Sequence, residues 1–273
     1  MPAMASARLI AEMLLRRGRT VAYGPDPSQC ADLNLPAGSG PHPVMVLLHG
    51  GSWRSQYGKR VMRGLVGDLL ARGWATWNVE YRRVGNGGGW PETFLDVAGA
   101  IDHLPQLGAT LDLDRVSVLG HSAGGHLALW AASRERLPPG APGCLDGQPR
   151  VRLRAAISQA GVCDLSTSAR RVPGGAAATL MGGGPDELPE RYAAADPILL
   201  LPTGVPVLLV HGTADQTVSV DYSRNYERAA RASGGEVELV EIAGPEGQHR
   251  RHIDPRGEAW SAVTCWLRAF ADA

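Results

Sequence analysis

One serine of this sequence stands in the setting that nucleophilic catalysis needs. Residues 120–124 read Gly-His-Ser-Ala-Gly, after the apolar run 116–119 and before the helix-forming stretch 126–132. A free serine hydroxyl is a poor nucleophile, so a catalytic serine is held on a sharp strand-to-helix turn where a base can reach it. Glycines two positions before and after the serine suit such a strained turn. We therefore predict that Ser122 is a nucleophile.

A glycine-rich turn offers donors for the negative charge that attack by a serine creates. Residues 49–53, His-Gly-Gly-Ser-Trp, directly follow an apolar, strand-like run. Backbone N–H groups in such a turn can point at an oxyanion, and the first N–H of the helix after the serine can do the same. We predict an oxyanion hole formed by Gly50, Gly51, Ser52 and Ala123.

A serine nucleophile also needs a base and a carboxylate that orients the base. Asp215 ends the motif His-Gly-Thr-Ala-Asp after the apolar run 205–210, and His249 and His252 follow the last predicted strand. His249 is the favoured base, because His252 lies close to the start of the final helix and is expected to pack there. Asp215 is the favoured acid, and Asp164, at the end of the preceding strand, stays an alternative.

Aromatic and charged residues near these turns could complete the site. Trp53 and Trp90, with Tyr57, are candidates to line an apolar substrate pocket, although core packing is the commoner fate of such side chains. Glu80 and Arg82 flank a strand end and could form a buried pair that shapes the oxyanion loop, or equally a surface pair.

Strand-like and helix-like stretches alternate along the chain and must position these groups. The alternation indicates an α/β fold, a mostly parallel sheet with helices on both faces. Strands are expected at 44–49, 75–81, 115–120, 154–160, 205–211 and 236–242, with irregular or antiparallel strand material at 19–35. Helices are expected near 5–17, 57–72, 91–104, 123–134, 219–232 and 255–271.

The length of 273 residues is sufficient for one substantial core, so we predict a single domain over residues 1–273. The stretch at about 164–202 interrupts the alternation with glycine- and proline-rich sequence between two sheet strands. A long connection poor in regular structure is often a lid. We predict a cap or lid insertion there, with a plain solvated connection as the alternative.

Composition and charge narrow the function classes. The chain has 27 Lys and Arg against 27 Asp and Glu, and its arginines fall in scattered pairs, so a nucleic-acid partner is not expected. No apolar stretch reaches the roughly 18 residues of a membrane span, and the N-terminus does not have the pattern of a secretory signal. We expect a cytoplasmic protein that acts on a small molecule; a homodimer stays open.

The four cysteines lie far apart and lack the spacing of a zinc site. They are Cys30, Cys144, Cys163 and Cys265. This favours free thiols in a reducing compartment, and we predict no metal and no cofactor.

These motifs make the chain resemble the α/β-hydrolase superfamily over about residues 20–271. Within it, the chain is similar to esterases with an HGG oxyanion motif and to kynurenine formamidase-like enzymes, through residues 49–53, 80–82, 120–126 and 211–215. Serine, aspartate and histidine occur in the order that this superfamily has.

The resemblance also extends to the loop that carries the base. In that group the loop has the form Gly-Asp-His-Phe-x-x-Ile-Asp-Pro, and residues 247–255 match it in register, which implies that His249 is the base. Gln248 and Arg250 replace the acidic and aromatic neighbours of the histidine. An unusually polar pocket around the base is therefore expected.

The resemblance implies metal-free hydrolysis of a small carboxylic ester or of a formamide. We predict a serine hydrolase that cleaves small to medium carboxylic esters through Ser122, His249 and Asp215, with an acyl-enzyme intermediate. An arylformamidase acting on N-formylkynurenine-type amides is the alternative. A peptidase is disfavoured because no large gating domain precedes the hydrolase region, and a non-catalytic ligand-binding protein is disfavoured because all three catalytic residue types occur in order.

Overall fold

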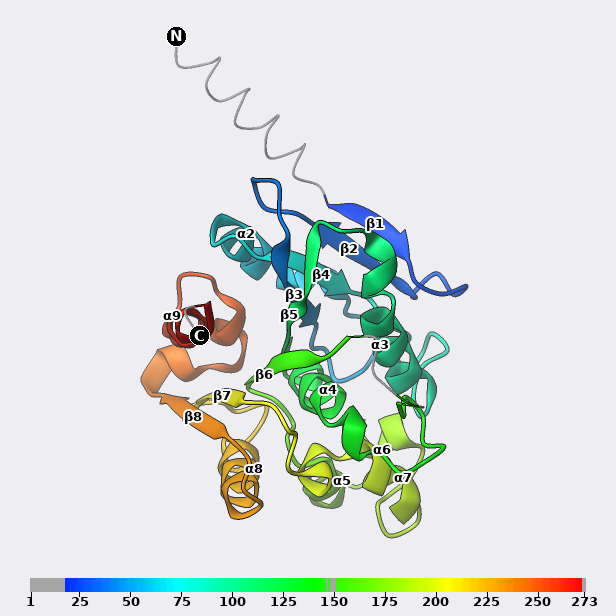
Figure 1. Ribbon diagram of the computed structural model, residues 1–273. Coiled ribbons are helices and arrows are strands. Elements are labelled where there is room, and N and C mark those ends of the chain that lie inside the picture. Colours follow the sequence, from blue (N-terminus) through cyan, green and yellow to red (C-terminus); the bar gives the residue numbers. More distant parts are fainter. Residues whose placement is uncertain (1–17, 146, 148–150, 272–273) are drawn as a thin grey trace.

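A single twisted sheet forms the centre of the molecule (Figure 1). The computed structural model describes residues 18–145, 147 and 151–271, and within them the sheet has eight strands in the order β1-β2-β4-β3-β5-β6-β7-β8. The helix predicted near 5–17 lies outside the described residues. The strands are β1 (Arg19–Ala22), β2 (Cys30–Asn34), β3 (His42–Leu48), β4 (Ala75–Val79), β5 (Leu111–His121), β6 (Leu153–Gln159), β7 (Val207–Gly212) and β8 (Val237–Ile242).

The strands from β4 to β8 in this order run parallel to one another. At the other side of the sheet, β2 pairs antiparallel with β4, and β1 pairs antiparallel with β2. Because the carboxyl ends of parallel strands meet at one edge, the loops after β3, β5, β6 and β7 all arrive at the same rim. This rim is where the sequence places its chemical groups.

Helices cover both faces of the sheet, which explains the continuous apolar sequence of its central strands. Residues 44–48 of β3 are all fully buried, and alternate side chains pack into two different hydrophobic clusters. One cluster includes α2 (Arg63–Ala71) and α9 (Glu258–Ala271); the other includes α3 (Glu92–Asp102), α4 (Ala123–Ala132) and α8 (Asp221–Ala232). The predicted α/β fold class is confirmed.

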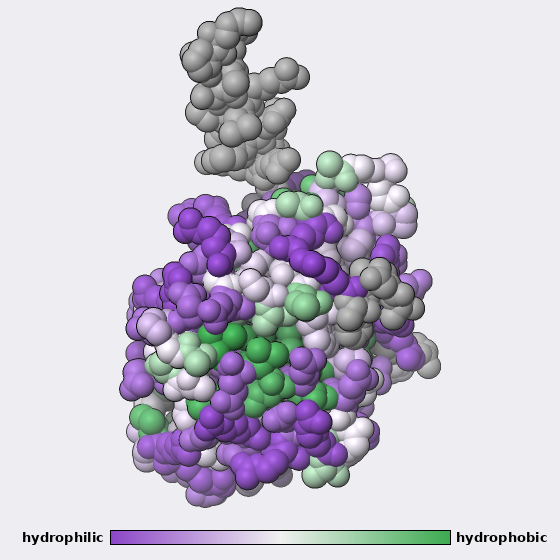
Figure 2. All heavy atoms as spheres, turned by 90° about the vertical axis from the view of Figure 1, so that its left-hand side faces the viewer, coloured by the Kyte–Doolittle hydropathy of each residue, from purple (hydrophilic) through white to green (hydrophobic). Residues whose placement is uncertain are grey.

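The side of the molecule that carries α2 and α9 is not uniformly polar. Figure 2 shows a hydrophobic area in the middle of that side, bordered by hydrophilic residues. Val66, Ile253 and Trp266 are partly buried hydrophobic residues that pack on the cluster beneath these helices. Apolar surface therefore reaches the exterior on this side of the molecule.

The segment 164–202 contains more regular structure than its sequence predicts. It forms α5 (Leu165–Arg171), α6 (Ala176–Met181), α7 (Pro189–Ala195) and the 3-10 turn η4 (Pro197–Leu200). Glycine and proline act at the helix ends: Gly175 precedes α6, Gly182 ends it with a left-handed conformation, and Pro189 begins α7. The expectation that this segment is poor in regular structure is therefore wrong.

Short 3-10 turns connect the larger elements. They are η1 (Lys59–Met62), η2 (Leu104–Leu107), η3 (Arg134–Arg136), η5 (Gly244–Gly247) and η6 (His249–Ile253). The last of these turns carries both candidate base histidines, where the sequence predicts a loop. His249 and His252 are therefore three positions apart in a helical turn.

Candidate active site

Ser122 lies on the turn between β5 and α4 and has a strained backbone. Its φ is 56° and its ψ is −120°, and its N–H donates to the carbonyl of Gln159 at 2.8 Å. The glycines two positions before and after Ser122 cannot be replaced without a steric clash. A Cβ on Gly120 would lie 1.9 Å from the Gly124 oxygen, and one on Gly124 would lie 2.0 Å from the Leu48 oxygen. Strand and helix thus approach so closely that only glycine fits at these two positions.

Asp215 and His249 form a hydrogen-bonded pair at the same rim. Asp215 Oδ2 lies 2.7 Å from His249 Nδ1, and Asp215 Oδ1 accepts from the N–H groups of Thr217 and Val218 at 2.8 and 2.9 Å. Because the carboxylate accepts at Nδ1, that nitrogen carries the proton and Nε2 is left as the basic position. The imidazole is thereby held in the tautomer that a general base needs.

The carboxyl group of Asp215 is kept ionised by its partners. Burial by itself would raise its pKa, but the hydrogen bonds from His249 and from the backbone of Val218 and Thr217 hold the pKa below its usual value. The side chain has no solvent exposure. Asp215 therefore carries a fixed negative charge behind the imidazole.

Ser122 and His249 line one cavity of about 310 Å³. The other lining residues are Gly50, Gly51, Ser52, Tyr57, Val61, His121, Thr217, Arg250 and Ile253. In the part of the chain that the structure describes, the Ser122 hydroxyl makes no hydrogen bond to His249. In enzymes without substrate such contacts are often long and tighten only in the complex.

Two side chains at strand ends hold the turn that carries the base. His121 Nε2 lies 3.0 Å from the carbonyl oxygen of His249, and Gln159 Nε2 donates to the carbonyl of His252 at 2.6 Å. Burial and the neighbouring His249 lower the pKa of His121 to about 3, so its ring is neutral and Nε2 donates. His121 thus orients the backbone of the turn that carries the base. Gln159 was missed, although its place at the end of the strand beside β5 could have indicated it.

The two alternative triad residues have other roles in the structure. His252 is fully buried, with Nδ1 3.1 Å from the carbonyl of His249, and it packs behind the base. Asp164 caps the N-terminus of α5 and accepts from the N–H of Thr167 at 2.9 Å. Neither side chain lines the cavity at Ser122.

The turn after β3 has three successive residues with positive φ. Gly51, Ser52 and Trp53 have φ values of 121°, 53° and 54°, and such conformations cost on the order of 1–3 kcal/mol for a non-glycine residue. His49 Nδ1 lies 2.7 Å from the carbonyl oxygen of Gly50. The N–H of Gly51 belongs to the same planar peptide unit and therefore points away from His49. Ala123 is the first residue of α4, so its N–H has no partner within the helix.

A partly buried carboxylate, that of Glu80, supports this turn. Glu80 Oε1 lies 2.8 Å from His49 Nε2 and 2.8 Å from Arg83 Nη1, while Glu80 Oε2 accepts from the N–H of Lys59 at 3.0 Å. The predicted pair of Glu80 with Arg82 is wrong. Arg82 Nη2 instead lies 2.7 Å from Asp96 on α3, because the chain leaves β4 at residue 79 and no longer alternates.

The two tryptophans predicted to bind substrate lie elsewhere. Trp53 is 2% exposed and packs edge-on against His126, and Trp90 packs edge-on against Phe94. Neither lines the cavity at Ser122, and no residue of 164–202 does so. Apolar walls come instead from Tyr57, Val61 and Ile253, of which only Tyr57 was predicted.

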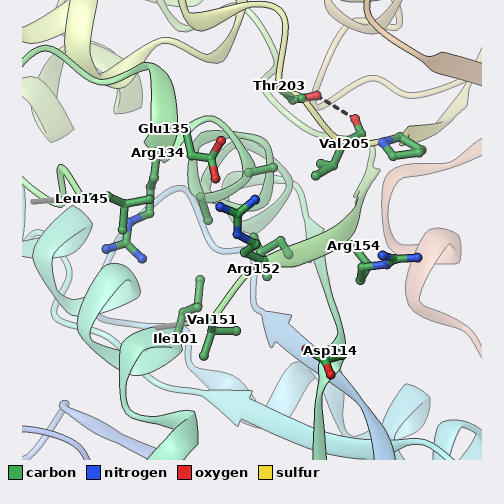
Figure 3. Close-up of a pocket in the computed structure, with 15 residues that line it drawn as sticks. Ile101, Asp114, Arg134, Glu135, Leu145, Val151, Arg152, Arg154, Thr203 and Val205 are labelled. Carbon is green, nitrogen blue, oxygen red and sulfur yellow. Dashed lines mark hydrogen bonds between the residues drawn. The ribbon is translucent and has the colours of Figure 1, made fainter. Parts of the chain in front are cut away.

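A second hollow, of about 500 Å³, opens at the opposite edge of the sheet (Figure 3). Its lining includes residues at the amino ends of β6 and β7 together with Arg134, Arg152, Glu135 and Asp114. Figure 3 shows these charges of both signs around one space. It lies at the edge away from Ser122, so it takes no part in the candidate site.

No metal centre is evident in the residues described. Among them no group of three or more His, Cys, Asp and Glu side chains could hold a metal ion. The same residues contain no helix with the length and apolar character that crossing a membrane requires. Each of the four cysteines is a free thiol.

Comparisons with known proteins agree with this fold. Residues 31–229 match the BD-FAE protein family. Esterase LipC of Mycobacterium tuberculosis is 29% identical over 246 residues, which cover 83% of this chain and 58% of that protein. The chain therefore spans little more than half of that relative.

Solved structures extend the likeness to the whole fold. A truncated carbohydrate esterase from gut microbiota has a TM-score of 0.81 at 21% identity, with 94% of this chain and 98% of that chain covered. Esterase Est2 of Thermogutta terrifontis, solved with propionate bound, has a TM-score of 0.73 at 23% identity, with 93% of each chain covered. The predicted α/β-hydrolase fold is confirmed.

Proposed function

Because the chain belongs to the BD-FAE family, we propose that it is a serine hydrolase that cleaves small to medium carboxylic esters. The observation that carries the proposal is the His249–Asp215 hydrogen bond of 2.7 Å at the wall of the cavity that Ser122 also lines. The names of esterase relatives support the same class of reaction.

In the proposed mechanism, Ser122 attacks the ester carbonyl while His249 Nε2 takes its proton. The ionised Asp215 stabilises the imidazolium that forms. His249 then gives the proton to the departing alcohol, and an acyl-enzyme remains on Ser122. A water molecule, activated by the same imidazole, attacks the acyl group and releases the acid.

The oxyanion of each tetrahedral intermediate needs donors that are fixed before the reaction. We assign this role to backbone N–H groups in the turn Gly50, Gly51, Ser52 and to the N–H of Ala123. Their support is the position of that turn on the cavity wall and the position of Ala123 at the N-terminus of α4. Loss of one such donor typically lowers turnover by roughly a hundredfold to a thousandfold.

The size of the cavity supports a short acyl group, as does the propionate bound in the Thermogutta terrifontis esterase.

We also propose that the protein works in the cytoplasm, supported by its four free thiols, since disulfides are rare in reducing compartments.

The direct test replaces the nucleophile. Ser122→Ala is expected to lower hydrolysis of 4-nitrophenyl acetate by roughly four to six orders of magnitude, whereas the matched change Ser261→Ala on α9 leaves it unchanged. A fluorophosphonate should label the parent protein at Ser122 and not the variant. Near-normal ester hydrolysis by Ser122→Ala would refute the mechanism. Formanilides tested in the same assay decide between ester and formamide hydrolysis.

A further inference from the structure

Arg250 is a charged side chain on the wall of the candidate active site. It directly follows His249 in η6 and lines the same cavity as Ser122. Its guanidinium has no ion pair or hydrogen bond with any residue in the part of the chain that the structure describes. Guanidinium groups bind carboxylates well because two N–H groups can meet two oxygens.

The acidic residues near this turn are committed to other partners. Arg251, the next residue, pairs with Glu246 at 2.5 Å and with Asp254 at 2.7 Å. Asp215 is directed at His249 and has no exposed side-chain surface. No carboxylate of the described residues lines the cavity, so the charge of Arg250 faces it without an opposite charge.

The proposed mechanism indicates which part of the substrate lies next to Arg250. The imidazole of His249 delivers its proton to the departing alcohol, so the alcohol portion of an ester must lie on the His249 side of the cavity. Arg250 is the adjacent residue on that side. Tyr57 and Val61 also line the cavity, and they offer apolar contact instead.

We propose that Arg250 makes this site select esters whose alcohol portion carries a carboxylate, that is, O-acylated hydroxy acids. This inference rests on the proposed ester hydrolysis and adds the substrate class to it. Arg250 binds the carboxylate of the leaving group and holds the ester while Ser122 attacks. It does not take part in bond making or breaking.

The test compares two esters that differ in one charge. These are 3-acetoxybenzoate and its neutral methyl ester, and the quantity of interest is the ratio of their kcat/KM values. Arg250→Gln is expected to lower this ratio about tenfold, as befits a charged hydrogen bond at an exposed site. Arg250→Lys keeps the charge and should give an intermediate ratio. Salt added to the parent protein should weaken its preference for the anion, because screening acts on exposed charges.

A matched control comes from the same region. Arg256→Gln removes an equal charge from a side chain that is 92% exposed and does not line the cavity, and it should leave the ratio unchanged. Inhibition gives a second measurement: 3-hydroxybenzoate should inhibit the parent more strongly than 3-hydroxybenzamide does, and Arg250→Gln should remove that difference.

Each outcome separates this inference from the proposed function. If Arg250→Gln leaves both the ratio and the inhibition unchanged while Ser122→Ala still abolishes hydrolysis of both esters, Arg250 does not select the anion and the hydrolase mechanism stands. If the parent protein cleaves neither ester, or Ser122→Ala cleaves both, the proposed function fails and this inference falls with it.

Discussion

At the residue scale, Asp215 shows how neighbours decide what a carboxyl group can do. It shares its residue type with Asp164, and both follow a strand at the same rim. Asp164 caps a helix. Asp215 instead accepts two backbone hydrogen bonds on one carboxylate oxygen and one hydrogen bond from His249 on the other. The sequence favours Asp215 by position alone, and the hydrogen bonds give the physical reason.

Because the two carboxylates have different roles, replacing each aspartate by asparagine should affect catalysis differently. Asp215→Asn should leave the fold intact and lower kcat for 4-nitrophenyl acetate by about ten-thousandfold, the size of loss seen when the orienting carboxylate of a Ser-His-Asp triad becomes an amide. Asp164→Asn should keep kcat within about twofold, since asparagine also caps helices well. A large loss in the second variant with none in the first would reverse the assignment of the acid.

At the element scale, the strand β5, the turn at Ser122 and the helix α4 act as one unit. Gly124 is fixed by contact with β3, because the backbone of α4 passes against Leu48 there with no room for a side chain. Helix propensity alone would place alanine at Gly124, since glycine costs roughly 1 kcal/mol within a helix. The close approach of helix to strand therefore outweighs propensity.

Gly124→Ala and Gly67→Ala test this balance in two helices. A Cβ at Gly124 would lie 2.0 Å from the Leu48 oxygen, so we expect loss of several degrees in Tm or failure to fold. Gly67 lies on the exposed side of α2 with nothing within 4 Å of a Cβ, and its change should raise the stability by roughly 0.4–1 kcal/mol. Thermal unfolding followed by circular dichroism measures both. Equal stabilisation by the two changes would contradict the steric argument.

Elements with a strong local pattern were predictable, and contacts between distant segments were not. Strands such as β3 and β7 follow directly from short apolar runs, whereas β5 begins at Leu111, four residues before its prediction, because residues 112–115 are not buried. The turn η6 has no local signature, since it is held by His121 and Gln159 from other elements. The place of Trp53 in the core likewise depends on His126, which is far away in the sequence.

At the scale of the whole molecule, the core contains several histidines that folding keeps neutral. Burial lowers the pKa of His121 to about 3 and the pKa values of His126 and His211 to about 4. Each ring is hydrogen-bonded in place: His126 Nε2, for example, lies 2.9 Å from the carbonyl of Ala195. In the unfolded chain the same rings take up a proton near pH 6.5.

Because these rings are neutral in the native state, the protein should become less stable as the pH falls below 7. Between about pH 6.5 and pH 4 the unfolded chain binds more protons at His121, His126 and His211 than the native state does, so the free energy of unfolding must fall as pH falls. Asp196 acts in the opposite direction, because burial raises its pKa to about 6 and the native state binds its proton more readily. The three histidines together change the free energy of unfolding more than the one aspartate does. We therefore expect Tm to fall by several degrees between pH 7 and pH 5. Differential scanning calorimetry across this range measures the slope, and a Tm that is constant or rises toward pH 5 would show that these rings are not held neutral by the fold.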